Sequence, residues 1–328
     1  MVTKILIRSP NWLGDGVMAF PAVRALRLRF PSAEIAVMTR SYLRNLWMDS
    51  PWVDRVIDVG REKVEELKRA WALRREGFDL YIAFPHSFLS ALTGFLSGAR
   101  VRVGYLSEGR GWLLSEGVKR DGRKIHRVYH YLKLLEPLGG VPPMDLPRIE
   151  VREEHVRWAE GLMEGGIAVG FNPGATYGEA KCWPWEYFVE LGRELNKRGV
   201  RVFIVGGKGD LERNRMIAQE IGQGCVDLTG RTTLGQLAGI LRQCRCLVTN
   251  DTGPMHVAAA VGTRVIALFG STDPAVTGPL GEGHRVMRRE VPCGPCFKRV
   301  CPEGHHKCMR EISPTEVLEA VLEILGNG

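Results

Sequence analysis

The chain has 328 residues, 45% of them hydrophobic, with a formal net charge of +8. It can therefore bury a large core, and its length suits two domains of about 150 residues each. Met1-Val-Thr-Lys runs directly into an apolar strand, without the long apolar core or the cleavage site of a secretory signal, so we expect a cytoplasmic protein.

The positive charge is confined to the first half of the chain. Residues 1–150 contain 24 Lys and Arg against 16 Asp and Glu, a net +8, whereas residues 151–328 contain 21 of each kind, a net charge of zero. The asymmetry predicts an anionic partner for the first half: a phosphorylated substrate, a negatively charged membrane face or nucleic acid. Charge that serves only solubility is the alternative.

Short apolar runs, each followed by a helical pattern, recur along the whole chain. Near-continuous Val, Ile and Leu runs of this kind predict parallel strands covered by helices on both faces. The expected strands are residues 4–9, 34–40, 55–60, 79–84 and 102–105 in the first half, and 166–172, 200–207, 246–251 and 264–270 in the second. The fold class is therefore α/β, with two doubly wound, Rossmann-like domains.

The uncharged run at residues 80–99 is long enough to span a bilayer, but Pro85, His86 and Gly94 divide it into strand, turn and helix. A glycine- and proline-rich segment at residues 139–147 places the domain boundary near residues 142–165, giving domains at 1–150 and 151–328. A closing helix is predicted to begin with a capping box formed by Ser313, Pro314 and Glu316. We expect that this helix is able to pack back on the first domain.

The first unusual loop follows the first strand and reads S-P-N-W-L-G-D-G-V-M-A-F-P-A-V. Gly14 and Gly16 let the backbone turn tightly, and Asp15 projects where the next helix begins. Asp15 is a candidate general base, with helix capping as the alternative. Ala19 occupies the third glycine position of the dinucleotide-binding fingerprint, which argues against a nicotinamide cofactor.

The second loop, F-N-P-G-A-T-Y-G-E-A-K-C-W-P-W, also lies between a strand and a helix. Thr176, Tyr177 and Lys181 supply hydroxyl groups and one mobile cation, which suit a diphosphate. The chain has no Walker P-loop spacing. A solvated lysine without a ligand is the alternative.

The third loop, C-L-V-T-N-D-T-G-P-M-H, leads into an alanine-rich helix. Backbone N–H groups at the start of that helix, together with Thr252 and Gly253, form a candidate phosphate site. Asp251 should reach a donor group such as a ligand hydroxyl, and His256 is either a ligand contact or a core histidine. An acid on the first domain facing a lysine and an anion-binding helix start on the second suits group transfer from a nucleotide diphosphate to a hydroxyl.

In their order and separation, the segments N-W-L-G-D-G, N-P-G-A-T-Y-G-E-A-K-C-W-P-W, N-D-T-G-P-M-H and C-G-P-C-F-K-R-V-C-P-E-G-H-H-K-C resemble the ADP-heptose:lipopolysaccharide heptosyltransferases, most closely type II. The resemblance implies a GT-B fold, with the active site in a cleft between two facing domains. It also implies inverting transfer of heptose from ADP-heptose, without cofactor or metal, to the lipopolysaccharide inner core.

By this resemblance Asp15 is the general base and Lys181 stabilises the departing diphosphate. Thr176 and Tyr177 join Lys181 at the diphosphate, although type I enzymes have a threonine where this chain has Tyr177. Asp251 holds heptose hydroxyls, with Thr252, Gly253 and His256 on the phosphate side. Either Asp210 or Glu212 meets the ribose.

The implied acceptor is an anionic lipopolysaccharide precursor, reached by peripheral contact with the cytoplasmic face of the inner membrane. The chain has no nucleic-acid-binding signature, so we expect no nucleic-acid partner. The alternatives are a GT-B transferase with another nucleotide sugar, and a noncatalytic nucleotide- or nucleic-acid-binding protein. Cys293, Cys296, Cys301 and Cys308, beside two histidines, leave a structural metal, a disulfide and reduced thiols open.

Overall fold

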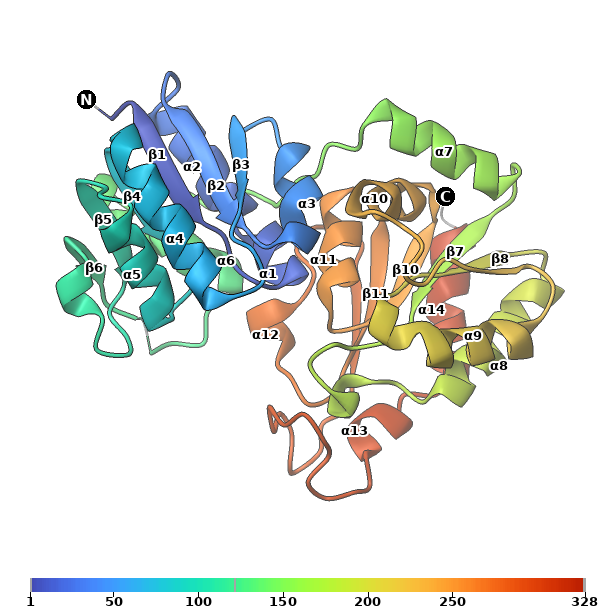
Figure 1. The fold of residues 1–328 in the computed structure, drawn as a ribbon. Helices are drawn as coiled ribbons and strands as arrows, with labels where there is room; N and C mark the ends of the chain where they lie inside the picture. The colour runs from blue at the N-terminus through green and yellow to red at the C-terminus, as the bar shows by residue number, and fades with distance from the viewer. Residues whose placement is uncertain (1, 121, 327–328) are drawn as a thin grey trace. The chain divides into compact units, whose positions relative to one another are not determined.

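The structure is a computed structural model that describes residues 2–120 and 122–326, so the ends of the two expected domains, Met1 and Gly328, lie outside the described residues. Its contacts divide the chain into two compact units, Met1–Pro147 and Arg148–Gly328 (Figure 1). The division falls within the segment where the prolines and glycines of the sequence prevent a continuous helix.

The first unit is a six-stranded parallel sheet with strand order β3-β2-β1-β4-β5-β6. Its strands are β1 (Lys4–Arg8), β2 (Glu34–Thr39), β3 (Arg55–Asp58), β4 (Leu80–Ala83), β5 (Val101–Tyr105) and β6 (Glu116–Val118). Its helices are α1 (Leu13–Met18), α2 (Phe20–Arg29), α3 (Arg44–Met48), α4 (Lys63–Leu73), α5 (Phe88–Leu96) and α6 (Arg127–Lys133).

The strands β1, β2 and β3 are added toward one side of the sheet. After β3 the chain crosses over to β4 on the other side of β1, and β5 and β6 follow in that opposite direction. Right-handed crossovers then place α2 and α3 on one face of the sheet and α4 and α5 on the other. Consistent with this, α4 packs against α5, and α2 packs against α6 (Figure 1).

The second unit repeats the arrangement with strand order β12-β11-β10-β7-β8-β9, again all parallel. Its strands are β7 (Ala168–Asn172), β8 (Arg201–Ile204), β9 (Cys225–Asp227), β10 (Cys246–Asn250), β11 (Arg264–Phe269) and β12 (Arg285–Arg288). Its helices are α7 (Glu153–Met163), α8 (Trp185–Lys197), α9 (Leu211–Ile221), α10 (Leu234–Gln243), α11 (Gly253–Ala260), α12 (Pro274–Thr277), α13 (Lys307–Arg310) and α14 (Pro314–Gly326).

The α/β class and the nine expected strands are confirmed, and the uncharged run at residues 80–99 forms β4, a turn and α5. In the described part of the chain, no helix is both long enough and apolar enough to cross a bilayer. Three strands, β6, β9 and β12, are not predicted from the sequence, and all of them lie at sheet edges. These strands are short and only partly buried, so they lack the apolar runs that mark central strands.

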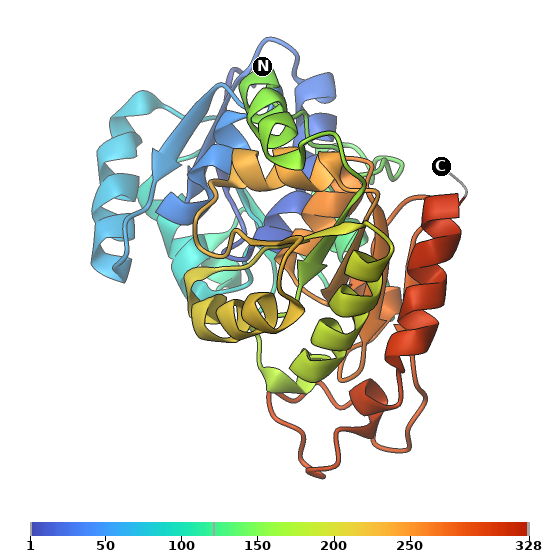
Figure 2. The ribbon, with the colours of Figure 1, turned by 90° about the vertical axis from the view of Figure 1, so that its right-hand side faces the viewer.

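The closing helix begins as predicted. The Ser313 hydroxyl accepts from the backbone N–H of Glu316, and the Glu316 carboxylate accepts in return from the backbone N–H of Ser313. The helix α14 packs against α8 and β11 of its own unit (Figure 2). Its apolar face, including Val317 and Val321, belongs to the core of the second unit. Its return to the first domain stays a prediction.

Candidate functional site

Asp15 lies inside a helix rather than at its cap. It is the third residue of α1, the N-cap position belongs to Trp12, and this helix start has no side-chain capping bond. The capping interpretation of Asp15 is therefore wrong. The neighbouring Gly16 is buried, and a Cβ atom there would come within 2.8 Å of the Leu46 side chain, so this glycine lets α1 approach α3 closely.

The Asp15 carboxylate is held through one of its two oxygens. The Tyr131 hydroxyl donates to Asp15 Oδ1 at 2.9 Å, and Arg127 Nε lies 3.8 Å from the same oxygen. Burial, reinforced by the negative charge of Asp15, raises the pKa of Tyr131 well above its usual value, so the phenol stays protonated and donates. Among the described residues Oδ2 has no hydrogen-bond partner, and the side chain is 25% exposed. One oxygen is thus oriented by the protein and the other can accept a proton.

A buried ion pair fixes the loop that leads to Asp15. Arg8, the last residue of β1, binds Glu66 of α4 through two contacts of 2.7 and 3.1 Å. Arg8 also donates to the Asn11 side chain at 2.9 Å. Both charged groups are almost fully buried, and the guanidinium binds the carboxylate through two nitrogens. The pair therefore constrains the loop between β1 and α1.

Basic groups gather at the same edge of this sheet. His86 follows β4, and its pKa is lowered to about 4, first by burial and then by the positive charges of Arg120, Arg110 and Arg127. The imidazole is therefore neutral near pH 7. Arg127, one of these three arginines, also contacts Asp15. The electrostatics suit an acceptor that carries negative charge.

The second predicted loop places Lys181 on a carboxylate. Lys181 ends a 3₁₀ turn (Glu179–Lys181), and its Nζ lies 2.6 Å from Asp251 Oδ2 and 3.2 Å from the Asp251 carbonyl oxygen. The Thr272 hydroxyl donates to the same Oδ2 at 2.7 Å. The two charged side chains are only 13% and 4% exposed. Lys181 is therefore a paired, buried cation, and the solvated alternative is wrong.

The strand ends of β7 and β10 bring the second and third loops together. Asn172 donates from Nδ2 to Thr249 at 3.0 Å and to Thr252 at 2.7 Å. Thr252 is the N-cap residue of α11, and its hydroxyl makes no capping bond. Gly253 is the first residue of that helix, and His256 is buried within it. The start of α11 thus retains backbone donors beside the Lys181–Asp251 pair, as a phosphate site requires.

The two hydroxyl residues of the second loop differ in their surroundings. Thr176 is exposed on the loop. Tyr177 donates its hydroxyl to the Phe297 carbonyl at 2.9 Å, and its ring lies 5.0 Å from Lys181 Nζ and 5.3 Å from the Arg299 guanidinium. The Tyr177 hydroxyl is thus bonded within the protein, and the contact of Tyr177 with a diphosphate stays a prediction.

Of the two candidate ribose contacts, Asp210 lies beside the second loop. A Cβ atom on Gly174 would come within 2.0 Å of Asp210 Oδ1, so the carboxylate rests directly on the loop backbone. The other carboxylate oxygen accepts from the Gly207 N–H at 3.0 Å. Glu212, in the first turn of α9, is exposed. Asp210 is thus the one of the two that lies against the predicted diphosphate loop, and the ribose contact itself stays a prediction.

The cysteine segment braces the second loop. The Arg299 carbonyl accepts from the Ala180 N–H at 3.0 Å, and the His306 ring lies 3.2 Å from the Ala180 carbonyl. All eight cysteines are free thiols. Among the described residues, no three Cys, His, Asp or Glu side chains group as ligands of a metal would. In the part of the chain that the structure describes there is thus neither a disulfide nor an assembled metal site, and the cysteine segment holds the second loop at Ala180.

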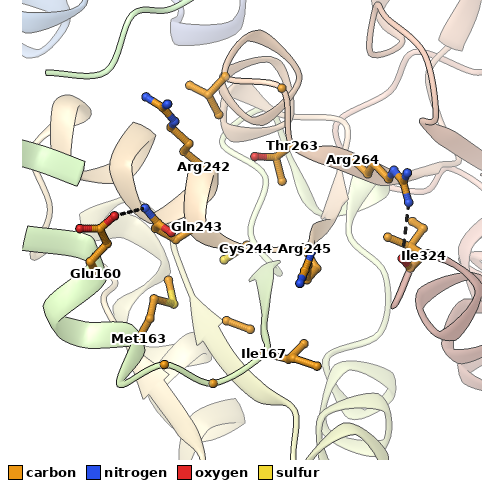
Figure 3. Close-up of a pocket in the computed structure, with 15 residues that line it drawn as sticks. Glu160, Met163, Ile167, Arg242, Gln243, Cys244, Arg245, Thr263, Arg264 and Ile324 are labelled. Carbon is orange, nitrogen blue, oxygen red and sulfur yellow. Dashed lines mark hydrogen bonds between the residues drawn. The ribbon is translucent and has the colours of Figure 1, made fainter. Parts of the chain in front are cut away.

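A hollow of about 680 Å³ lies at the amino ends of the strands in the second sheet, opposite the carboxyl ends that carry the predicted loops (Figure 3). Its walls include Ile167 before β7, Arg245 before β10, and the carboxyl ends of α7, α10 and α14. Arg264 donates to the Ile324 carbonyl at 3.4 Å, a bond that compensates the negative end of α14 (Figure 3). Lys181 and Asp251, the predicted donor-binding residues, lie at the carboxyl ends of the strands and do not line this hollow.

Three residues of the site, Tyr131, Arg127 and Thr272, are not predicted from the sequence. Each reaches its carboxylate from another element: Tyr131 lies 116 positions from Asp15, and Thr272 lies 21 positions from Asp251. The one signal in the sequence is the short basic and aromatic helix R-V-Y-H-Y-L-K, which places Arg127 and Tyr131 four residues apart on one face.

The comparisons with known proteins agree with these features. The model of glycosyltransferase family 9 (heptosyltransferase) matches residues 66–307. The chain is 32% identical to lipopolysaccharide heptosyltransferase 2 of Escherichia coli K12, over 98% of each chain, and 31% identical to lipooligosaccharide heptosyltransferase 2 of Haemophilus ducreyi, over 98% of this chain and 99% of the relative. The solved structure of ADP-heptose lipopolysaccharide heptosyltransferase II from Escherichia coli superposes with a TM-score of 0.88 at 31% identity, over 99% of both chains. The expected GT-B fold class and an enzymatic activity are thereby confirmed: the chain belongs to glycosyltransferase family 9, the heptosyltransferases, and is a glycosyltransferase.

Proposed function

We propose that this enzyme transfers heptose from ADP-heptose to the inner core of a lipopolysaccharide precursor, as the second heptose. The observation that carries the proposal is the buried lysine beside a helix start in the second unit. The oriented, half-open carboxylate of the first unit supports it. The names of the full-length relatives, which are type 2 heptosyltransferases of lipopolysaccharide or lipooligosaccharide, supply the sugar and the acceptor class.

In this mechanism the acceptor hydroxyl attacks the anomeric carbon of the donor, and its proton passes to Asp15 Oδ2. The bond between the anomeric carbon and the diphosphate oxygen breaks, and ADP leaves from the opposite side, so the configuration inverts. Tyr131 and Arg127 hold Oδ1 and thereby aim Oδ2 at the incoming hydroxyl.

The departing ADP gains negative charge, which Lys181 and the N–H groups at the start of α11 stabilise. Thr176 and Tyr177 contact the diphosphate from the second loop, while Thr252, Gly253 and His256 line its other side. Asp251 orients Lys181 and holds the heptose hydroxyls, and Asp210 meets the ribose. The sequence contains no D-x-D pair, the usual metal holder for sugar nucleotides, so we propose that the transfer needs no metal.

The acceptor precursor is anionic and lipid-borne, so the proposed enzyme works in peripheral contact with the cytoplasmic face of the inner membrane. The basic edge around His86 and Arg127 and the +8 charge of residues 1–150 support this placement. Nucleic acid is not part of the proposal.

The test is ADP release and product mass when the purified enzyme receives ADP-heptose and a monoheptosylated acceptor. Thermal-shift measurements with ADP, UDP and GDP check the donor, because the nucleotide that binds the folded state raises the midpoint of unfolding. We expect ADP to stabilise most. Preferential stabilisation by UDP or GDP, together with transfer from that nucleotide's sugar, would establish the second candidate, a GT-B transferase with another donor.

A further inference from the structure

Four large apolar side chains form an exposed cluster on the first unit, which we call the aromatic patch: Phe88, Phe95, Leu106 and Trp112. Trp112 lies in a 3₁₀ turn (Gly111–Leu113), and its ring centre is 6.2 Å from that of Phe88 and 6.5 Å from that of Phe95. The exposed fractions are 70% for Trp112, 44% for Phe95, 41% for Leu106 and 38% for Phe88. Single exposed apolar residues are ordinary, but a contiguous aromatic group indicates a binding surface.

The backbone beneath the aromatic patch is fixed, so its exposure is not the result of a loose loop. The fully buried Arg110 donates to the carbonyl oxygens of Tyr105, Pro85 and Ser87 at 2.8–2.9 Å. Glu108 accepts from the Phe88 N–H at 2.9 Å. These bonds tie the loop after β5 to the start of α5 and hold the patch in place.

A basic side chain lies beside the aromatic patch, and basic residues outnumber acidic ones in the segment that carries Leu106 and Trp112. Residues 100–127 contain eight Lys and Arg against three Asp and Glu. The Arg102 guanidinium lies 5.8 Å from the centre of the Phe95 ring, and α4, which packs against α5, exposes Trp71 beneath Arg74. The acidic exceptions among the described residues of this segment are Glu108 and Glu116. Exposed aromatic rings among Lys and Arg are the chemistry of a surface that enters an anionic lipid interface.

The position of the aromatic patch relates it to Asp15 of the same unit. Phe88 and Leu106 follow the carboxyl ends of β4 and β5, and Asp15 follows the carboxyl end of β1, which pairs directly with β4. The Phe88 and Leu106 end of the patch therefore belongs to the same sheet edge as the proposed base, and the patch extends from there along α5 to Phe95. A bilayer that held the patch would bring a lipid-borne acceptor toward the edge that carries Asp15.

We propose that the aromatic patch is the surface by which this enzyme docks on an anionic bilayer, with the rings in the interfacial region and the neighbouring guanidinium and ammonium groups on the headgroups. The proposal that the patch docks on a bilayer is supported by the exposed rings and by the positive charge beside them. Only its purpose, delivery of a lipid-borne acceptor to Asp15, rests on the proposed function.

The direct test is co-sedimentation with vesicles of phosphatidylcholine alone and of an equal mixture of phosphatidylcholine and phosphatidylglycerol. We expect the wild type to prefer the anionic vesicles, with weaker binding at high salt. A Phe95→Ser/Trp112→Ser variant should lose affinity by on the order of tenfold per aromatic ring. The matched control is Leu28→Ser on α2, which removes a 68% exposed apolar side chain from the opposite face of the same sheet and should bind like the wild type.

A second readout separates docking from catalysis. Turnover of a lipid-free saccharide acceptor should be equal in the wild type and the double variant, whereas turnover of an acceptor embedded in anionic vesicles should fall in the double variant. Vesicle binding needs no ADP-heptose, so it tests the patch even if the proposed donor is incorrect. Equal vesicle binding by the double variant, no preference of the wild type for anionic vesicles, or a wild-type dimer that the double variant dissociates would each overturn the proposal.

Discussion

Asp15 in the first unit and Asp251 in the second are both carboxylates that follow the end of a parallel strand, yet the protein treats them in opposite ways. Asp15 is 25% exposed and is held through Oδ1 alone by Tyr131 and Arg127. Asp251 is 4% exposed, and its Oδ2 receives both Lys181 and Thr272. The first arrangement leaves an oxygen that can take a proton, whereas the second neutralises the carboxylate and fixes a cation. Similar positions in the fold thus support two different roles.

The largest expected effect comes from removing the half-open carboxylate. Asp15→Asn keeps the size of the side chain and the Tyr131 contact but removes the base, so kcat should fall by about 10²- to 10⁴-fold. The assay is steady-state ADP release, with circular dichroism and ADP binding as controls for folding and for the donor site. Retention of most of the activity would remove Asp15 from the role of base.

The second largest effect is expected from Lys181, the cation that pairs with the Asp251 carboxylate. Lys181→Met leaves Asp251 as a buried charge without its cation, so the free energy of unfolding should fall by about 3 kcal/mol. Transfer should slow by about 10²- to 10³-fold, because the leaving diphosphate loses its counter-charge. Urea unfolding and ADP release measure the two changes.

The double variant Lys181→Met/Asp251→Asn separates the two losses. It contains no unpaired buried charge and should regain most of the lost stability, while transfer remains slow. If the double variant also recovers transfer, Lys181 serves the fold and not the leaving group.

A smaller effect is expected from the orienting phenol. Tyr131→Phe removes a hydrogen bond to a charged acceptor without opening a large cavity, and kcat should fall by about tenfold while KM for the donor stays unchanged. A purely structural role would lower the melting temperature without this split between kcat and KM. Tyr129→Phe, a 41% exposed tyrosine on the same helix, is the matched control and should leave kcat unchanged.

The smallest effect is a pH dependence of stability. The His86 pKa is lowered from 6.5 to about 4, so between these values the unfolded chain binds a proton that the folded chain does not. The free energy of unfolding should therefore decrease as the pH falls through this range. His86 is partly exposed, and we expect its contribution between pH 7 and pH 5 to be about 1 kcal/mol. Urea unfolding of His86→Gln at both pH values should show a pH-induced loss smaller by this amount; an equal loss in both proteins would contradict the assignment.

The sequence alone predicted the architecture and the loops that carry the candidate site. Central strands such as β1 and β10 contain three consecutive apolar residues, and the Ser313–Glu316 capping box is local, so both are visible in the sequence. Edge strands such as β12 bury less and leave a weaker pattern. The fold and the positions of the loops can therefore be predicted from patterns of residues that are close together in the sequence.

The partners within the site could not be predicted in the same way. Asp251 and Lys181 were both candidates, but their ion pair joins residues 70 positions apart and depends on the pairing of β7 with β10. The Asp15–Tyr131 bond spans 116 positions. A residue's chemistry can be inferred from its type, but whether it is paired or open depends on tertiary contacts that a single sequence does not record.

The most direct test of the central claim, a single displacement assisted by the open oxygen of Asp15, is the configuration of the product. Nuclear magnetic resonance of the heptosylated acceptor reports its anomeric configuration, which can be compared with that of the donor. We predict inversion, because in a single displacement the acceptor hydroxyl attacks the face of the anomeric carbon opposite the departing ADP. A product that retains the donor's configuration would contradict the account.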